Sequence, residues 1–175
     1  GGRCIVHFAA FLGVIDTQTA FMAIDGVHRA AIKDNNVALS MTDVSRLEIH
    51  KEFSFLNTGS PHHVEMVTNL KDINVVDKGR AIRNNRYGAA GANINFVSKI
   101  SEDTFCVRTY ERGVEDETLS CGTGVTAVAL AMFKTKQTTS SKVYLITPGG
   151  DLSVSFDKKE NTFTNIVLSG PATQV

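Results

Sequence analysis

The sequence has no excess of either charge. Its 18 Lys and Arg residues balance its 18 Asp and Glu residues, and the basic residues are scattered rather than gathered into a stripe. A nucleic-acid binder needs such a stripe to displace counterions from phosphates, so this class of partner is excluded. With 42% hydrophobic and 21% charged residues over 175 positions, the composition is that of a globular protein and not of a membrane-spanning one. We therefore expect a small-molecule ligand.

Cysteine is scarce. The three cysteines are an odd number and show neither a CxxC pair nor a Cys/His zinc spacing. This pattern predicts no metal site and favours reduced thiols in the cytoplasm over a disulfide framework. A signal peptide and an initiator Met are also lacking, and the chain opens with Gly1–Cys4 directly before an apolar stretch. We expect the natural N-terminus to lie upstream.

One thiol stands in a setting suited to chemistry. Cys121–Gly124 (CGTG) opens the apolar stretch Val125–Phe133, which predicts a cysteine at the first turn of a buried helix. The unpaired amides of a helix start favour a thiolate and can hold a substrate carboxylate. A free cysteine more often packs as a small hydrophobe, and we interpret Cys4 and Cys106 in that way. For Cys121 the glycines and the helix start favour an acid, base or nucleophile.

The hydrophobic pattern predicts a second helix and several short strands. The helix, Cys4–Val14, is apolar on nearly all sides and is expected to be enclosed by other elements. Leu47–Val67 has two strand-like runs around a loop at Asn57–His63, and the polar stretch Asp72–Gly91 is expected to be solvated surface with at most a short helix. Further strands are expected at Ala20–Ile24, Val27–Ile32, Val37–Met41, Ala92–Ile100, Thr104–Glu111, Val143–Ile146, Leu152–Phe156 and Phe163–Leu168.

The order of helix, strand, glycine turn, strand, polar turn and strand occurs twice. Gly26 and Gly149 are 123 positions apart (149 − 26), and so are Gly1 and Gly124 (124 − 1). Because each copy has its own faces to bury, we expect an α+β fold of two pseudo-symmetric lobes, each an antiparallel sheet wrapped around a central helix.

The repeat also predicts the domain limits. We expect the remainder of an N-terminal lobe at residues 1–45, a C-terminal lobe at 46–169, and the start of a return to the first lobe at 170–175. Subtracting the offset from Cys121 gives position −2, three residues before Gly1. The first lobe is therefore expected to be incomplete, with the position that mirrors the thiol in an upstream segment.

Four motifs in this order resemble those of diaminopimelate epimerases, and the resemblance covers essentially the whole chain. They are Asn57–His62 (NTGSPH), Gly91–Asn93 (GAN), Thr109–Gly113 (TYERG) and Cys121–Gly124 (CGTG), preceded by the opening GGRC, which resembles the end of that family's first cysteine motif. The resemblance implies a cofactor-independent isomerase that works without pyridoxal phosphate. Two cysteines would interconvert LL- and meso-diaminopimelate for lysine and peptidoglycan precursor synthesis.

The resemblance also implies roles for single residues. Cys121 corresponds to the second catalytic cysteine, and Glu111 and His62 to the polar pair that tunes the thiols. The residues that would bind the substrate are Ser60, Asn93, Glu111, Arg112, Gly122 and Thr123. Arg suits the distal carboxylate because its guanidinium bonds both oxygens. Ser60 stands where many members have Asn, so one distal contact is expected to be shorter or bridged by water.

Three alternatives remain at the level of sequence. A related racemase or isomerase of the same fold would differ in substrate, and an inactive fragment would lack the first catalytic cysteine. A metal site from His62, His63 and Cys121 has no closed ligand set. By analogy with the family, we also expect a homodimer.

Overall fold

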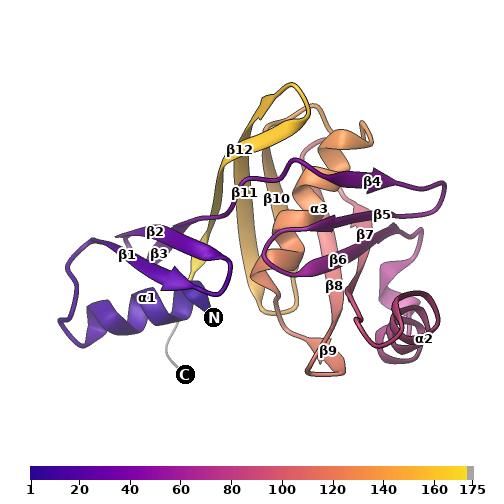
Figure 1. Cartoon of the computed structure of the whole chain (residues 1–175), viewed down its shortest axis with the longest axis horizontal. Helices are drawn as coiled ribbons and strands as arrows, with labels where there is room; N and C mark the ends of the chain where they lie inside the picture. Colours follow the sequence, from indigo (N-terminus) through magenta and orange to yellow (C-terminus); the bar gives the residue numbers. More distant parts are fainter. Residues whose placement is uncertain (173–175) are drawn as a thin grey trace.

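Helix α3 (Gly122–Lys134) lies at the centre of the larger part of the molecule, with strands curved around it (Figure 1). The computed structural model describes residues 1–172. In α3 an unbroken run from Gly124 to Met132 is buried, which requires neighbours on every side of the helix. The buried helix predicted from the apolar stretch after Cys121 is therefore confirmed.

The strands of the described residues form one 12-stranded sheet, in the order β1-β2-β3-β12-β11-β10-β8-β7-β6-β5-β4, with β9 paired to β8. Two pairings, β6 with β7 and β8 with β10, are parallel, so the sheet is mixed where the sequence predicted antiparallel pairing alone. The strands are β1 (Gln18–Ala23), β2 (Gly26–Lys33), β3 (Asn36–Ser40), β4 (Leu47–Ile49), β5 (Ser54–Asn57), β6 (Pro61–Met66), β7 (Asn93–Lys99), β8 (Thr104–Glu111), β9 (Asp116–Thr118), β10 (Lys142–Thr147), β11 (Gly150–Lys159) and β12 (Thr162–Pro171).

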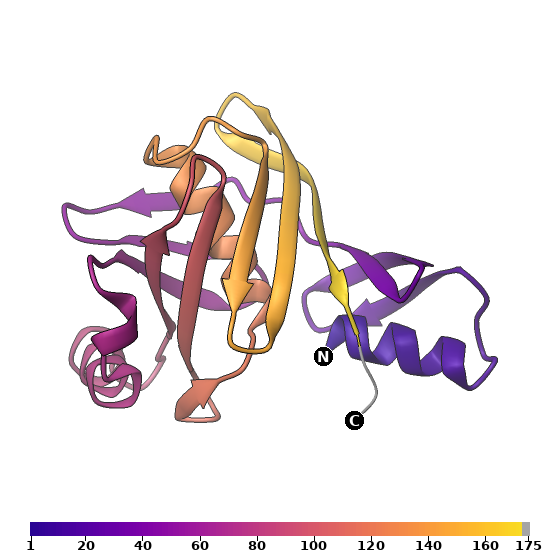
Figure 2. The ribbon, with the colours of Figure 1, turned by 180° about the vertical axis from the view of Figure 1, so that it is seen from behind.

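The internal repeat is visible in the sheet. One copy is helix α1 (Gly2–Phe11) with β1, β2 and β3, and the other is α3 with β10, β11 and β12. The last strands of the two copies, β3 and β12, pair antiparallel as the third and fourth strands of the order, and this pair joins the two copies (Figure 2). The predicted α+β fold with two pseudo-symmetric lobes is confirmed. Of the predicted return segment 170–175, Gly170 and Pro171 are the end of β12, and residues 173–175 lie outside the described part.

Helix α1 differs from the prediction of an enclosed helix. Only Val6 is buried, whereas Ile5, Phe8, Phe11 and Leu12 are more than half exposed. The reason is that α1 packs mainly against β2 and β3, while α3 contacts strands on several sides from β5 to β12. A helix that is apolar on all faces is therefore not necessarily buried on all faces.

The segment after β6 is largely exposed, as predicted for a solvated surface, but its helix is longer than expected. It forms the turn η1 (Leu70–Asp72) and the 13-residue helix α2 (Val75–Tyr87), of which only Val75 and Gly79 are buried. The side chain of Asn74 caps α2 by accepting a hydrogen bond from the amide of Asp77. Gly79 packs α2 against β8 so closely that a Cβ there would lie 2.4 Å from the Cβ of Tyr110.

The loop expected at Asn57–His63 is shorter than predicted. Strand β6 begins at Pro61, so His62 and His63 belong to a strand, and both are buried. The polar run before Cys121 also contains the short strand β9, which the sequence pattern did not reveal. Both histidines therefore lie in rigid structure, where their positions are set by the pairing of β6 with β5 and β7.

We predict that Gly79→Ala destabilises the fold although it raises helix propensity. The propensity gain is about 1 kcal/mol, but overpacking against Tyr110 costs about 1–3 kcal/mol because both backbones must move. Urea unfolding should give a lower free energy of unfolding for the variant. Asn85→Ala, at an exposed position of the same helix, is the control and should be neutral or stabilising. Equal stability of the Gly79→Ala protein would contradict the close packing of α2.

Candidate active site

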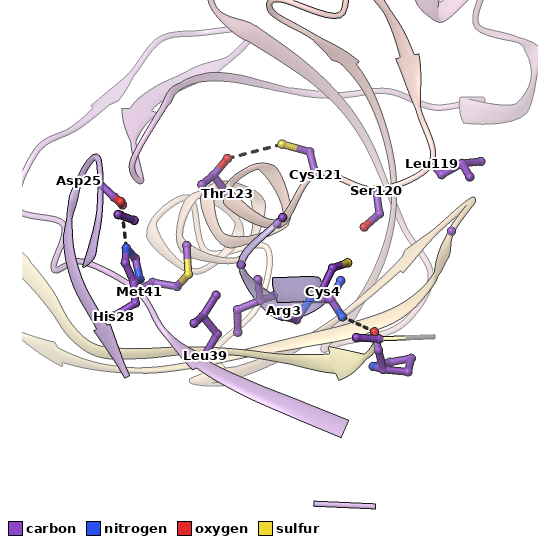
Figure 3. A pocket seen from close by; sticks show the side chains of 18 of the residues that line it. Arg3, Cys4, Asp25, His28, Leu39, Met41, Leu119, Ser120, Cys121 and Thr123 are labelled. Atoms are coloured by element: carbon purple, nitrogen blue, oxygen red, sulfur yellow. Dashed lines mark hydrogen bonds and ion pairs between the residues drawn. The ribbon is translucent and has the colours of Figure 1, made fainter. Parts of the chain in front are cut away.

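A cavity of about 610 Å³ lies between the first turns of α1 and α3 (Figure 3). From α1 and the residue before it the lining contains Gly1–Cys4, and from the start of α3 it contains Ser120–Thr123. Glu111 at the end of β8 and the hairpin residues Asp25 and His28 complete its polar part. Two helix N-termini thus open into one cavity, which concentrates unpaired amides and positive dipole ends there.

Cys121 is the N-cap residue of α3 and is 8% exposed. Its Sγ lies 3.5 Å from the Oγ1 of Thr123, the contact drawn in Figure 3. Burial raises the pKa of the Cys121 thiol, and the charge of Glu111 raises it further, while the Thr123 hydroxyl and the amide of Gly124 lower it. The Gly124 amide thus favours the thiolate, as the sequence predicts for a helix start, but the pKa of the thiol is raised overall. Loss of water around the sulfur outweighs the helix start.

His62 reaches the cavity only through Thr123. Its ring is wholly buried, with Nε2 2.9 Å from the Thr123 Oγ1 and Nδ1 3.2 Å from the Asn95 Nδ2. Burial, together with the nearby charge of Arg112, lowers the pKa of His62 to about 3. The ring is therefore neutral at physiological pH and acts here as a hydrogen-bonding group rather than as a cation.

Ser60, Asn93 and Arg112 form a separate cluster that does not line the cavity. The Asn93 Nδ2 donates to the Ser60 Oγ at 2.9 Å, and the Asn93 Oδ1 accepts from the Arg112 amide at 2.9 Å. The guanidinium of Arg112 donates to the carbonyl of Ala90 at 2.9 Å and makes only a 3.5 Å contact with Ser60. One end of this guanidinium is thus weakly engaged.

Gly59 connects the cluster to the cavity. It has a φ of +104°, and a Cβ at this position would lie 2.5 Å from the Oδ2 of Asp25 and 3.5 Å from the Cγ2 of Thr123. The hairpin between β1 and β2 therefore rests on the loop that carries Ser60. Only glycine combines this backbone conformation with such a close approach.

The structure brings the predicted residues together in two groups. Glu111, Cys121, Gly122 and Thr123 line the cavity with His62 directly behind them, and the cluster of the other three residues lies beyond Gly59. The Cys4 interpretation as a packing residue is wrong, because Cys4 is exposed and lines the cavity, whereas Cys106 is half-buried in β8 and does not line it.

Sequence reasoning missed Asp25, His28 and Asn95. The pair Asp25-Gly26 gave only a turn signal, and Asn95 was read as part of a strand. For Asn95 the available signal was a polar residue in the apolar run of β7, where a buried amide needs partners.

Asp25 and His28 form an ion pair at the edge of the cavity, with the His28 Nε2 2.9 Å from the Asp25 Oδ1. The His28 Nδ1 lies 2.6 Å from the carbonyl oxygen of Ser40, which can only accept a hydrogen bond. Both ring nitrogens face acceptors, so this geometry suits the imidazolium. Burial lowers the pKa of His28, but the bonds to Asp25 and Ser40 outweigh it and raise the pKa overall.

Residues 1–172 offer neither a metal centre nor a membrane-spanning helix. No group of three or more His, Cys, Asp or Glu side chains in this part of the chain is placed to hold a metal ion. None of its helices is long and apolar enough to cross a membrane.

We predict that His28 stabilises the fold at low pH and loses this effect as the pH rises. Because its folded pKa lies above the unfolded value of 6.5, the contribution is complete below that value and disappears through the folded pKa. Urea unfolding of wild type and His28→Gln at about pH 5.5 and about pH 9 measures the difference. The pH-dependent contributions of other groups, including His62, are the same in both proteins and cancel in the difference between them. A gap between the two proteins that stays constant or widens at high pH would contradict the ion pair.

The chain matches the family model described as diaminopimelate epimerase over residues 54–175. It is 52% identical over 174 residues to a diaminopimelate epimerase of Flavobacterium psychrophilum, covering 98% of this chain and 68% of that protein. A diaminopimelate epimerase of Aquifex aeolicus is 38% identical, with 95% and 65% covered, so the chain spans about two thirds of these relatives.

A solved structure of a hydroxyproline epimerase from Agrobacterium vitis has the same fold. Its TM-score is 0.72 at 14% identity, and the match covers 97% of this chain and 62% of that one. This likeness supports the fold alone. The family model and the identity to curated relatives go further, and they confirm the resemblance carried by the four motifs: the chain belongs to the diaminopimelate epimerase family.

Proposed function

We propose that this chain carries one half of the acid/base machinery of a cofactor-independent epimerase that interconverts LL- and meso-diaminopimelate. The observation that supports it most is the position of Cys121, an N-cap thiol that opens into a cavity faced by a second helix start. Inversion at a carbon needs a proton acceptor on one face and a donor on the other, and opposed helix starts supply two such faces.

The first amides of α3 would hold the reacting carboxylate. The amides of Gly122 and Thr123 have no partner within the helix, because the first intrahelical bond runs from Val125 to the carbonyl of Cys121. As the α-proton leaves, negative charge moves onto the carboxylate, so these amides and the helix dipole stabilise the transition state more than the ground state.

Cys121 is suited to the donor role in the free protein. Burial raises the pKa of its thiol, so the proton is present at neutral pH and is available to the carbanion. In the opposite direction Cys121 must first lose this proton, and the Thr123 hydroxyl is placed to stabilise the thiolate. His62 and Glu111 would tune this balance, His62 through Thr123 and Glu111 by its charge.

The cluster beyond Gly59 would bind the distal end of the substrate. The Arg112 guanidinium has one weak contact, the 3.5 Å approach to Ser60, which a carboxylate would replace with a charge-assisted bond. Asn93 holds the Arg112 backbone in place through its Oδ1 and presents its amide beside Ser60. A substrate with a second amino-acid end therefore fits this arrangement better than a simple amino acid.

The second thiol would come from a segment that precedes Gly1 and joins the cavity at the start of α1. The repeat supports this position, since α1 and α3 occupy equivalent positions in the two copies. In this proposal residues 1–45 belong to the N-terminal lobe and 46–169 to the C-terminal lobe, with 170–175 leading back. We also propose a homodimer, and the cytoplasm as the location, where the three free thiols would stay reduced.

We predict that Cys121→Ala abolishes epimerisation when the upstream segment is supplied, because no group then moves a proton on one face. The assay separates LL- from meso-diaminopimelate to measure inversion and follows solvent deuterium incorporation at the α-carbon in parallel, with proline as a competing substrate. Cys106→Ala, a thiol outside the cavity, is the matched control and should retain activity. More than a trace of inversion by Cys121→Ala would refute the role of this thiol, and faster exchange with proline would indicate a racemase of another substrate.

We predict that a protein made only of Gly1–Val175 does not invert diaminopimelate, because one thiol serves one face of the carbon. Adding the upstream segment should restore turnover, and adding it with Ser in place of its cysteine should not. Cys4 lines the cavity and is the one other thiol there among the described residues, so Cys4→Ala is tested in parallel. Full activity of the 175-residue chain, lost on Cys4→Ala, would mean that Cys4 is the second acid/base group.

A further inference from the structure

A line of buried polar side chains runs beneath the first turn of α3 and ends at the cavity. It begins at Thr109 on β8 and passes through Asn95 on β7 and His62 on β6 to Thr123 and Cys121 on α3. Thr109, Asn95 and His62 are each at most 3% exposed. Buried amides and hydroxyls are rarely kept in a core without a specific set of partners.

The orientation of the Asn95 amide is fixed by a backbone carbonyl, which can only accept a hydrogen bond. Its Nδ2 lies 2.8 Å from the backbone carbonyl of His63, which can only accept, so this atom is the NH₂ group. Its Oδ1 accepts from the Thr109 hydroxyl at 2.9 Å. The second hydrogen of the NH₂ group is directed at the His62 Nδ1, 3.2 Å away.

This orientation determines where the His62 proton lies. A ring nitrogen that accepts a hydrogen bond carries no proton, so in the neutral ring the proton is on Nε2. The Nε2 then donates to the Thr123 Oγ1 at 2.9 Å, which leaves the Thr123 hydroxyl proton free to point at the Cys121 Sγ. With the other tautomer, Thr123 would donate to His62 and no hydroxyl proton would face the sulfur.

We infer that Asn95, held by Thr109, is a positioning residue that sets the His62 tautomer and so directs a hydroxyl donor at the Cys121 sulfur. Asn95 and Thr109 lie outside the set of residues that would touch the substrate. Their importance for turnover rests on the proposed epimerase function, whereas their effect on the thiol does not.

Gly124 has a place in the same arrangement. A Cβ at this position would lie 2.6 Å from the Oδ1 of Asn95, so a side chain here would push the amide away. Gly124 does not have a positive φ, and thus its backbone conformation alone does not require glycine. The last glycine of the CGTG motif is explained by the space that Asn95 needs under the helix.

The chemical consequence concerns the thiolate. A hydroxyl that donates to sulfur stabilises the negative charge more than the neutral thiol, and the burial that raises the pKa of Cys121 makes such a donor more important. If Asn95 no longer fixes the His62 tautomer, the Thr123 hydroxyl donates to the thiolate for only part of the time. Fewer thiolates should then form at a given pH.

Two measurements on the Gly1–Val175 protein test this inference without any substrate. Nitrogen-15 NMR of the His62 ring reports which nitrogen carries the proton, and peptide-resolved mass spectrometry follows alkylation of Cys121 by iodoacetamide against pH. In wild type we expect the proton on Nε2. In Asn95→Leu we expect a mixture of tautomers and, at about pH 8, slower alkylation of Cys121, by less than the about tenfold that complete loss of one hydrogen bond to a charged group gives.

Three further variants make the test decisive. Thr109→Val keeps the shape of the side chain and should shift the His62 tautomer and the Cys121 alkylation rate in the same direction as Asn95→Leu, by a smaller amount. If Asn95→Leu does not fold, the Thr109→Val result tests the inference in its place. Thr123→Val removes the donor in every molecule and should slow Cys121 alkylation by about tenfold, more than Asn95→Leu does. Thr123→Ser keeps the hydroxyl and should alkylate like wild type. Alkylation of Cys4, which is exposed, should be the same in all variants.

The inference is overturned if wild-type His62 carries its proton on Nδ1. It is also overturned if folded Asn95→Leu or Thr109→Val protein alkylates at Cys121 like wild type. A protein that passes these tests but shows no exchange with diaminopimelate in the presence of the upstream segment would disprove the proposed function and leave the tautomer control standing.

Discussion

The structure depends on the enclosure of α3, a helix with apolar or small side chains on all sides. Because Gly124–Met132 is buried, the sheet must curve around the helix. The polar groups of the first turn can therefore reach the cavity only at the N-terminal end of the helix. Cys121 lies at that end, and so do the unpaired amides of the first turn. The burial that holds the fold together therefore also places the Cys121 thiol and the unpaired amides of Gly122 and Thr123 at one cavity.

The same enclosure has a chemical cost, which the surrounding polar groups offset in part. Taking the sulfur out of water raises the pKa of Cys121, and the carboxylate of Glu111 adds to this effect. The Thr123 hydroxyl and the amide of Gly124 act in the opposite direction. Because the His62 pKa is lowered to about 3, the ring supports Thr123 as a neutral group and adds no positive charge to the site. The reactivity of the thiol is thus a balance between desolvation and a few directed hydrogen bonds.

Features encoded locally or by repetition were predictable from the sequence. The run after Cys121 predicted α3, and the constant offset between Gly26 and Gly149 predicted the two related copies. The features that the sequence did not predict depend on partners that are distant in the chain. The exposure of α1 follows from how few strands cover it, and the roles of Asn95 and His28 follow from backbone carbonyls on other strands. No local pattern identifies such partners.

The most direct test of this account is protection of Cys121 by the substrate. Iodoacetamide is added to the protein, supplied with its upstream segment, in the presence and absence of diaminopimelate, and alkylation of each cysteine is followed by mass spectrometry. If the cavity between the two helix starts binds the reacting carbon, Cys121 should be protected in proportion to occupancy, while Cys106, which lies outside the cavity, should react at an unchanged rate. Alkylation of Cys121 that is indifferent to saturating diaminopimelate would contradict the account.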